Sequence, residues 1–486
     1  MKARHPVANH LRRLIPGQTQ SFALPLKDRS GPLACDRLLR LLPGKRAAFY
    51  GHYGSDEVIA KLFFKRSRHR ALCKRELDGL LALADSGCET PPILYTGAAS
   101  DSAVTVLLLK WLPGAQSVLA RWPLLTNDAD RQQLLNALAD VLARQHLGGV
   151  WQADLHLGNF LWHDDRIVCI DGDEVRRQDG PLSRALGFDN FALFCAQLPP
   201  RWDALLAQAF AQYQRQRFGD SVISWQAFLP AVQQHRRRRL EMMLEKAGRS
   251  TTWLQTARIG KHQLSWQRSW QEPALTAFCE QPDQVVDGAS QRLKDGNSAT
   301  VVRCDWQQGP VVIKRYNLKS RWHACKRALQ TSRAERSFAF AHALRLFEID
   351  TPLPVACSVR KNGPFNAEAF YVSAAVDGVS LQQFLAGDQP LTPAQHDVMG
   401  RVADLFAELR SLQLVHGDTK ASNILIRDGK PVLLDLDAMR QVTSAGALRK
   451  RFAADMARLL RNFADQPDRT EAMADALRSR GLLQGD

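Results

Sequence analysis

The sequence predicts an α+β fold built as two tandem units, each with a small antiparallel sheet followed by a helical lobe. Three observations lead to this prediction. The chain has 486 residues, of which 45% are hydrophobic, so it is long enough for more than one core. Two distant stretches share one spacing of polar residues. Around both stretches the expected order is the same: a helical pattern, a loop and a short buried strand.

The repeated spacing is the strongest of these observations. The first stretch reads WQADLHLGNFL from Trp151, and an apolar run, IVCID, then ends at Asp171. The second reads LVHGDTKASNILI from Leu414, and PVLLD ends at Asp435. In each stretch, an Asn follows the first Asp by five residues, and the later Asp follows the first Asp by seventeen. The two copies lie 264 residues apart. The residues concerned are Asp154, Asn159 and Asp171, and Asp418, Asn423 and Asp435.

This order of elements suits phosphoryl transfer. A loop Asp orients the attacking hydroxyl, an Asn five residues later holds metal, and an Asp at the end of a strand bridges Mg²⁺ to the phosphates. We therefore expect Asp154 and Asp418 to be catalytic. The four expected metal ligands are Asn159, Asp171, Asn423 and Asp435.

The same chemistry needs a strand lysine to neutralise phosphate and a helical glutamate to hold that lysine in place. In the first copy, EVIAKLFF places Lys61 in a strand pattern, and CKRELDGLLALADSG places Glu76 on an amphipathic helix. In the second, PVVIKRYN supplies Lys314 and SRAERSFAFAHAL supplies Glu335. These four residues are the expected nucleotide-binding pairs.

A turn-forming segment precedes each lysine strand. It reads Pro43-Gly44-Lys45-Arg46 in the first copy and runs from Lys294 through Gly296 to Ser298 in the second. Backbone N–H groups of such turns can contact phosphates, so Gly296 joins the expected nucleotide-binding residues. Neither turn has the full G-x-G-x-x-G pattern. Asp189 and Asp455, on the helices expected next, are candidates to support the two catalytic loops.

Each of these residues also has an ordinary structural interpretation. A single loop Asp or Asn is usually a turn or cap residue. A lone strand lysine or helix glutamate is usually a solvated charge. The duplication changes this weighting, because turn and surface residues have no need to keep identical types and spacing in two copies whose other residues differ.

The charge balance favours an anionic partner. Lys and Arg number 65 against 49 Asp and Glu, a net charge of +16. Such a surface attracts anionic lipid, lipopolysaccharide cores or nucleic acid. No nucleic-acid-binding motif is present, so no specific nucleic acid is expected. The basic runs KRSRHR, at 65–70, and RRRR, at 236–239, are solvated faces or anion-binding sites, and the sequence leaves both alternatives open.

Cysteines and hydropathy bear on the compartment. The nine cysteines are scattered and form no CxxC pair, which argues against a disulfide framework or a zinc site and favours a reducing cytoplasm. No uninterrupted apolar run is long enough to span a bilayer. Any membrane contact is therefore expected to be peripheral.

The two residue sets together resemble the protein-kinase-like superfamily. The motifs PGKR, IKRYNLKSRWH and SRAERSF, with the later TPLP, resemble the lipopolysaccharide kinase family of Kdo and WaaP-type core heptose kinases. The resemblance covers nearly the whole chain, in two units. It implies two tandem protein-kinase-like bilobal domains that use ATP and Mg²⁺. It also implies a cytoplasmic enzyme at the inner-membrane face of a Gram-negative bacterium, which phosphorylates a sugar hydroxyl, on heptose or Kdo, of the anionic lipopolysaccharide inner core.

Some features depart from the family pattern. Gln152 stands where the second copy has His416, and His156 stands where it has Lys420. These differences favour the second copy as the active one. No A-P-E segment is evident, which argues against a regulated protein kinase. Two alternatives stay open: a nucleotide-binding pseudokinase scaffold in lipopolysaccharide core assembly, and a kinase acting on protein or another small molecule. The acceptor sugar and the oligomeric state are not predicted.

The predicted domain boundaries follow from these assignments. We expect an N-terminal extension over residues 1–34, a first domain over 35–247, a linker over 248–272 and a second domain over 273–486. The nucleotide is expected between the sheet and the helical lobe of each domain.

Overall fold

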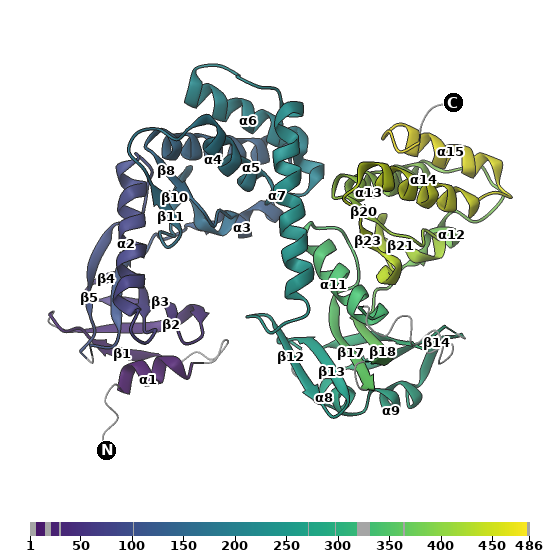
Figure 1. The fold of residues 1–486 in the computed structure, drawn as a ribbon, viewed down its shortest axis with the longest axis horizontal. Coiled ribbons are helices and arrows are strands. Elements are labelled where there is room, and N and C mark those ends of the chain that lie inside the picture. The colour runs from purple at the N-terminus through teal and green to yellow at the C-terminus, as the bar shows by residue number, and fades with distance from the viewer. Residues whose placement is uncertain are drawn as a thin grey trace. The chain divides into compact units, whose positions relative to one another are not determined.

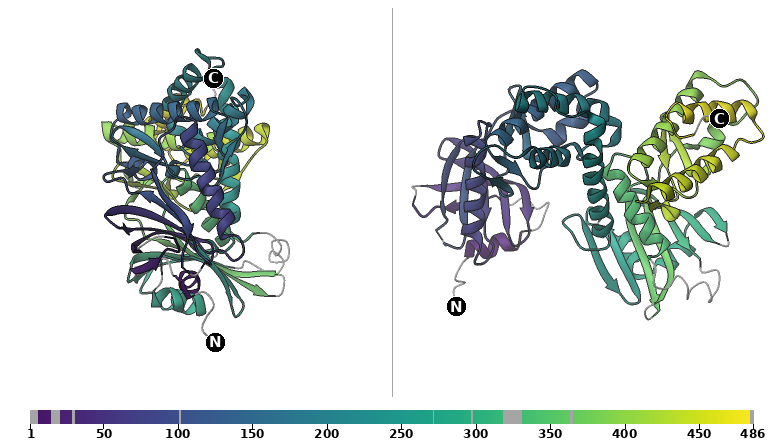
Figure 2. Two further views of the ribbon diagram at one scale, coloured as in Figure 1. Left: turned by 90° about the vertical axis from the view of Figure 1, so that its left-hand side faces the viewer. Right: turned by 45° about the horizontal axis from the view of Figure 1, so that its top comes forward.

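A computed structural model describes residues 6–14, 21–28, 31–100, 102–270, 272–296, 298–317, 331–362 and 365–483. The chain mixes antiparallel sheets with helices and divides into two compact units. The first contains residues 1–198 and 202–232, and the second contains 199–201 and 233–486. Within each unit, the large sheet and the main group of helices lie at opposite ends (Figure 1, Figure 2).

The first unit begins with an antiparallel sheet in the order β1-β2-β3-β4-β6-β5. Residues in β4 alternate between its two faces, as its burial shows. Val58, Ala60 and Leu62 pack into one core, whereas Phe63 packs on the other face against helix α2. Lys61 therefore lies on the α2 side. The elements of this part are α1 (Pro6–Arg12), β1 (Phe22–Pro25), β2 (Pro32–Leu42), β3 (Arg46–Tyr53), β4 (Asp56–Phe63), α2 (His69–Asp85), β5 (Ile93–Ala98) and β6 (Thr105–Lys110).

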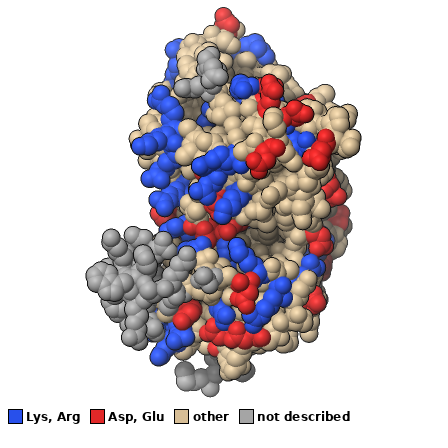
Figure 3. Space-filling model, turned by 90° about the vertical axis from the view of Figure 1, so that its right-hand side faces the viewer, with Lys and Arg blue, Asp and Glu red and all other residues tan. Residues whose placement is uncertain are grey.

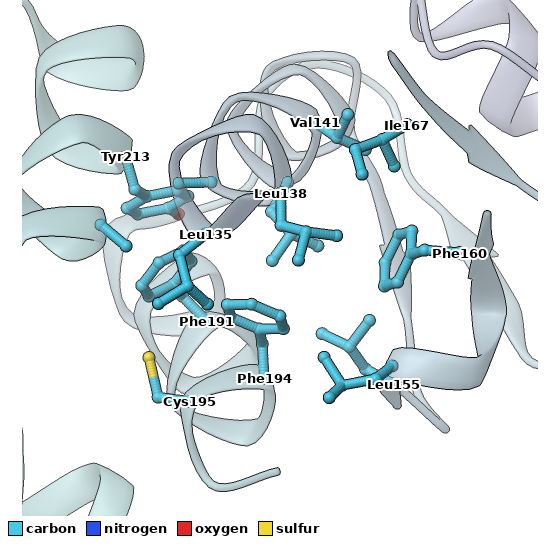
Figure 4. Close-up of a cluster of buried hydrophobic side chains, with 14 of the residues drawn as sticks. Leu135, Leu138, Val141, Leu155, Phe160, Ile167, Phe191, Phe194, Cys195 and Tyr213 are labelled. Carbon is cyan, nitrogen blue, oxygen red and sulfur yellow. The ribbon is translucent and has the colours of Figure 1, made fainter. Parts of the chain in front are cut away.

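The helical part of the first unit is built around α4, which begins where the Asn127 side chain accepts a hydrogen bond from Asp130 N. Apolar residues of α4, α5 and the β9–β10 hairpin meet in one core, together with Tyr213 of α6 (Figure 4). The loop before β9 therefore packs against this hydrophobic core. The elements are β7 (Gln116–Ser117), α3 (Val118–Arg121), α4 (Asp128–Leu147), β8 (Val150–Gln152), β9 (Phe160–His163), β10 (Arg166–Cys169), β11 (Val175–Arg177), α5 (Arg184–Cys195) and α6 (Asp203–Phe218). Helix α7 (Trp225–Lys246) belongs to the first unit up to residue 232 and to the second unit from residue 233.

The second unit has a large antiparallel sheet in the order β12-β13-β17-β18-β16-β15-β14. Val311 and Ile313 of β16 are buried in one core with Val302 and Phe370. Lys314, the next residue, lies on the opposite face. The elements are β12 (Leu254–Ile259), β13 (His262–Gln267), α8 (Pro273–Glu280), α9 (Pro282–Asp287), β14 (Gln291–Gly296), β15 (Ala299–Trp306), β16 (Gly309–Tyr316), α11 (Arg333–Leu346), β17 (Pro354–Asn362) and β18 (Phe365–Ala374).

The helical part of the second unit repeats the order of the first. Its long helix α13 starts with a capping box formed by Thr392 and Gln395. A short loop follows β20 and leads into the β21–β22 hairpin. The elements are β19 (Val379–Ser380), α12 (Leu381–Phe384), α13 (Pro393–Ser411), β20 (Leu414–Val415), β21 (Ile424–Arg427), β22 (Lys430–Leu433), β23 (Arg440–Gln441), α14 (Ala445–Arg461) and α15 (Pro467–Arg478).

Two segments differ from the sequence-based boundaries. The expected linker, 248–272, contains β12 and β13, and β13 pairs with β17 of the second unit's sheet. Leu264 of β13 is buried in that core, so these residues belong to the sheet. The expected extension, 1–34, contains α1 and β1; Ala8 and Leu11 of α1 are fully buried in the first unit's sheet core. Packing of apolar side chains, absent from a true linker, accounts for both differences.

In the described ranges no cysteine forms a disulfide bond. Within the same ranges, no helix combines the length and the apolar character that a membrane crossing requires.

Candidate active site

In the first unit the structure brings Lys61 and Glu76 into direct contact. Glu76, on α2, is fully buried, and its Oε1 accepts a hydrogen bond from the Lys61 ammonium. Arg46 donates to Glu76 Oε2 at 3.1 Å, and the backbone N–H of Gly172 reaches Oε1 at 3.3 Å. A buried carboxylate needs such partners, because an unpaired buried charge is costly. Lys61 also donates to the carbonyl of Ile170 at 2.8 Å, beside Asp171.

Two glycines allow helix α2 to approach this site. A Cβ on Gly79 would come within 2.0 Å of the carbonyl oxygen of Gly172, and a Cβ on Gly172 would come within 2.1 Å of the carbonyl oxygen of Glu76. Both neighbours are backbone atoms, which cannot rotate away. The glycine pair therefore sets how closely Glu76 and Asp171 approach each other.

Asp171 lies among positive charges. Burial by itself would raise the pKa of Asp171, but the Lys61 ammonium, the Asp173 backbone N–H, Arg46 and Arg40 favour the charged form and lower the pKa below its usual range. The Asp173 N–H donates to Asp171 Oδ1 at 3.1 Å. Asp171 is thus an ionised carboxylate at neutral pH, as a metal ligand must be.

The loop before β9 carries the other two predicted residues. Asn159 Nδ2 donates to the carbonyl of Asp154 at 2.8 Å and to Gln152 Oε1 at 3.0 Å, which fixes the amide's orientation. Asn159 Oδ1 is buried and has no hydrogen-bond partner among the described residues. The carboxylate of Asp154 is exposed. Asp154, Asn159 and Asp171 line one small pocket together with Gln152 and Arg46.

These residues fit Mg²⁺, which takes oxygen ligands from one or two carboxylates and completes its shell with waters and substrate phosphates. The unpartnered Asn159 Oδ1 and the ionised Asp171 supply two such oxygens. Within the described ranges, no group of three or more His, Cys, Asp or Glu side chains could hold a metal ion. Waters and oxygen atoms of a bound nucleotide would complete the coordination.

In the second unit Lys314 has different partners. Its ammonium donates to Asp435 Oδ1 at 2.5 Å and approaches Asp437 Oδ2 at 3.4 Å. Burial would raise the pKa of Asp435, but Lys314 lowers it below its usual range. Burial and the neighbouring Asp435 instead raise the pKa of Asp437, although Lys314 and Arg333 oppose this. Asp435 therefore has the lower pKa of the two carboxyl groups.

The expected pairing of Lys314 with Glu335 is not formed in this structure. Glu335 lies at the third position of α11 and closes a capping box, in which its carboxylate accepts from Ser332 N at 2.9 Å and its own N–H donates to Ser332 Oγ at 3.1 Å. The S-x-x-E pattern that predicts such a cap is present in the sequence. Arg333 of the same helix contacts Asp437 instead, with its Nε at 3.0 Å.

We predict that Glu335→Ala lowers the free energy of unfolding of the second unit by about 1 kcal/mol, because the hydrogen bond from Ser332 N to the Glu335 carboxylate is lost from the capping box. The affinity for Mg·ATP stays within about twofold, since the side chain does not hold Lys314. Glu335→Gln, which can keep the capping box, serves as the matched control. Urea unfolding and nucleotide titration test this. A large loss of nucleotide affinity in Glu335→Ala alone would show that the glutamate does act on Lys314.

In the second unit, Asn423 and residues of α14 hold the loop that carries Asp418. Asn423 Nδ2 donates to the carbonyl of Asp418 at 2.9 Å and to its Oδ2 at 3.2 Å. The Asp418 carboxylate also accepts from Arg458 of α14. Asp455 of α14 accepts the backbone N–H groups of His416, at 2.9 Å, and of Gly417, at 3.0 Å. Asp455 thus supports this loop from below, as the sequence suggested.

In the first unit Asn190, the residue after Asp189, contacts the corresponding loop. Asp189 is exposed, whereas Asn190 is buried and donates to the carbonyl of Gln152 at 2.8 Å. Asn190 also contacts His146 Nε2 at 3.1 Å. On helix α5, Asn190 points inward and Asp189 points to solvent. The sequence analysis therefore placed the inward face of this helix one residue too early.

Gly296 ends strand β14, in the hairpin before the lysine strand. Its carbonyl accepts from Asn317 Nδ2 at 3.1 Å, and a Cβ at this position would meet nothing closer than 3.6 Å. The position thus has room for a side chain, and the structure gives no steric reason for a glycine.

Sequence analysis missed several charged residues of these sites. Arg46 bridges Glu76 and Asp173, with 3.2 Å between its Nη1 and Asp173 Oδ2. Asp173 and Asp437 follow Asp171 and Asp435, the predicted metal ligands, by two residues each, so they share the 264-residue offset. A search of the repeat beyond its last Asp would have found this second acidic pair.

Comparisons with known proteins bear on the second unit most directly. No curated protein matches the chain. Among solved structures, the PknI kinase domain of Mycobacterium tuberculosis matches over 40% of this chain and 94% of its own length, with 18% sequence identity and a TM-score of 0.27. Residues 277–479 match the lipopolysaccharide kinase (Kdo/WaaP) family, whose members are phosphotransferases that act on sugar hydroxyls.

Proposed function

We propose that this chain is a Mg²⁺-dependent kinase that transfers the γ-phosphate of ATP to a sugar hydroxyl, on heptose or Kdo, of the lipopolysaccharide inner core. The observation that carries the proposal is the pocket of the first unit, where Asp154, Asn159 and Asp171 meet beside the Lys61–Glu76 pair. The family match of residues 277–479 supports the sugar acceptor and the second unit's part in the reaction.

The proposed mechanism is an in-line transfer. Asp154 or Asp418 orients the sugar hydroxyl and takes its proton as the new oxygen–phosphorus bond forms and the bond to ADP breaks. Lys61 or Lys314 steadies the nucleotide's phosphates. Asn159 and Asp171, or Asn423 and Asp435, would hold Mg²⁺, which neutralises charge on the phosphate oxygens. In the second unit the Lys314 ammonium contacts Asp435 Oδ1, so a bound metal ion would share the Asp435 carboxylate with Lys314 or displace it.

Positive charge beside Asp418 supports an anionic acceptor. Arg449, Lys450, Arg451 and Arg461 of α14 are exposed, while the one acid of this helix, Asp455, is buried under the catalytic loop. On the face of the molecule drawn in Figure 3, Lys and Arg gather on one side of the upper part and acids on the other. A cationic surface next to the reacting hydroxyl attracts phosphorylated or carboxylated sugars.

Arg451 and Arg458 extend the cationic surface of α14 to Asp418, the proposed catalytic residue. They are seven residues apart on α14 and therefore share one helix face. Arg458 contacts Asp418, and Lys420 lies 3.7 Å from the same carboxylate. The expected route for an anionic acceptor runs along Arg451 toward Asp418.

We predict that Arg451→Ser raises the acceptor KM about threefold to fivefold and leaves the KM for ATP unchanged, the size expected for one exposed charge contact. Arg449→Ser is the matched control, since Arg449 is exposed on the same helix but two residues away, on a different face. Steady-state kinetics with lipopolysaccharide core as acceptor measure both. An equal effect of the two substitutions would mean that bulk charge, not this face, attracts the acceptor.

The high net charge of +16 also supports a peripheral position at the cytoplasmic face of the inner membrane, where ATP and an anionic glycolipid are both present. The proposed function is tested by mass analysis of the lipopolysaccharide core from cells with and without the gene. The expected difference is one missing core phosphate. The purified chain should restore it to the mutant core with Mg·ATP. An unchanged core and no transfer to it would reject the proposal.

A second candidate is that one unit binds nucleotide without transferring phosphate and acts as a scaffold in core assembly. The observation that favours it is the second unit's Lys314, which contacts Asp435 and Asp437 and not the helical glutamate. Separate inactivation of the two catalytic loops decides between the candidates, as described below.

A further inference from the structure

The strand register places a second cation in line with the site lysine of each unit. In the first unit Arg40 of β2 pairs with Ala48 of β3, and Ala48 pairs with Lys61 of β4. Residues in one such row point to the same face of an antiparallel sheet. Arg40 and Lys61 are therefore two strands apart, roughly 10 Å, on the face toward Asp171.

The pocket between these two cations is open. Arg40, Ala47, Ala48, Lys61 and Asp171 line it together with Arg46 and Leu42. The alanine in the middle of the row leaves the space that a larger side chain would fill. Arg40 lies at the mouth, with a side chain that is 59% exposed, whereas the Lys61 side chain is 17% exposed.

Arg40 is the cation of this pocket that can rearrange. Arg46 is bound to Glu76 and Asp173, and Lys61 is bound to Glu76. Arg40 approaches Asp171 only to 3.9 Å, which is longer than a hydrogen bond. A guanidinium presents several N–H donors in a plane and suits phosphate oxygens.

The second unit repeats the row with different residues. Lys294 of β14 pairs with Val301 of β15, and Val301 pairs with Lys314 of β16. Lys294 is exposed, like Arg40. The two sheets thus agree in placing a cation two strands from the site lysine, although the strands that carry it differ in sequence.

The turn of the first unit shows why such a cation is useful. The turn between β2 and β3 does not have the G-x-G-x-x-G pattern, and its Lys45 N–H donates to the carbonyl of Leu42 at 3.0 Å. That N–H closes the turn and is not available to a ligand. A side-chain cation can then replace a backbone contact to phosphate.

We infer that Arg40 binds the phosphates of a nucleoside triphosphate in the first unit, and that Lys294 is its counterpart in the second. This assignment rests on the proposed function, namely that each unit binds Mg·ATP. Phosphate is then bound by two residues in each unit: the site lysine and a cation on the strand before the turn. The phosphate-binding surface is the face of the sheet more than the backbone of the turn.

Calorimetric titrations of the full chain with Mg·ATP and with adenosine test the inference. For Arg40→Met, we expect Mg·ATP affinity of one site to fall about tenfold and adenosine affinity to stay unchanged, since the substitution removes charge-assisted hydrogen bonds to phosphate alone. Lys294→Met should do the same at the other site. Arg37→Met is the matched control, because Arg37 lies on the same strand over the Tyr50 ring and does not line the pocket.

The outcomes separate the inference from the function on which it rests. A wild-type chain that binds no Mg·ATP rejects the proposed function. A wild-type chain that binds Mg·ATP, with Arg40→Met and Lys294→Met variants that bind it equally well, rejects the inference alone. Loss of adenosine binding in the same variants would also reject it, because the effect would then not be on phosphate.

Discussion

Replacing both Asp154 and Asp418 with Asn is expected to reduce phosphate transfer by roughly a thousandfold or more, while Mg·ATP still binds. A positioned general base contributes on the order of 10²–10⁴ in rate. Asn has the same shape but cannot take the proton. In the structure the Asp154 carboxylate is exposed at the pocket and is accessible to an acceptor. The Asp418 carboxylate is held in position by Asn423 and Arg458.

The single variants identify the active unit. If the second unit alone transfers phosphate, Asp418→Asn shows the full loss and Asp154→Asn shows none. If both units transfer, each single variant retains part of the rate. Radiolabelled transfer to core oligosaccharide measures turnover, and calorimetry checks nucleotide binding. Full activity in the double variant would contradict the assignment of both aspartates.

The second large effect is expected for Glu76→Ala, which should lower the free energy of unfolding of the first unit by about 3–5 kcal/mol. Glu76 is fully buried and is the common partner of Lys61 and Arg46, whose side chains are 17% and 19% exposed. Removing it leaves two largely buried cations without this carboxylate. The Mg·ATP affinity of the first unit should fall as well, since Lys61 is no longer held beside Asp171.

Glu89→Ala is a suitable control for Glu76→Ala. Glu89 pairs with Arg166 at 2.9 Å, but the two side chains are 48% and 72% exposed, so the expected loss is at most about 1 kcal/mol. Hydrogen exchange resolved by peptide reports on the first unit alone. Similar losses in the two variants would show that Glu76 is no more important than a surface ion pair.

The repeated Asp–Asn–Asp spacing predicted which residues gather at one site, but it did not predict the hydrogen-bond partner of each side chain. A strand lysine, a loop Asn and a strand-end Asp are local features, and the elements that carry Lys61, Asn159 and Asp171 could be recognised from apolar patterns. Their approach depends on the Gly79–Gly172 contact between distant segments. No local pattern shows which glycines meet.

Local sequence patterns could not predict which partner each charged side chain contacts. Glu76 and Glu335 both occupy a helix after the lysine strand, yet one is buried against Lys61 and the other caps its own helix. The capping pattern at Ser332 favoured the second outcome and competed with the repeat. Strands β12 and β13 were missed because their Gln, Thr and Ser residues are typical of a linker, and their stability comes from pairing with β17.

The central claim is that each unit has one Mg·ATP site, and the stoichiometry of Mg·ATP binding tests it most directly. Calorimetric titration of the full chain should give two bound nucleotides per chain. Combined replacement of Lys61 and Lys314 by Met should weaken both. A wild-type chain that binds no nucleotide, or that binds it equally well without the two lysines, would contradict the account.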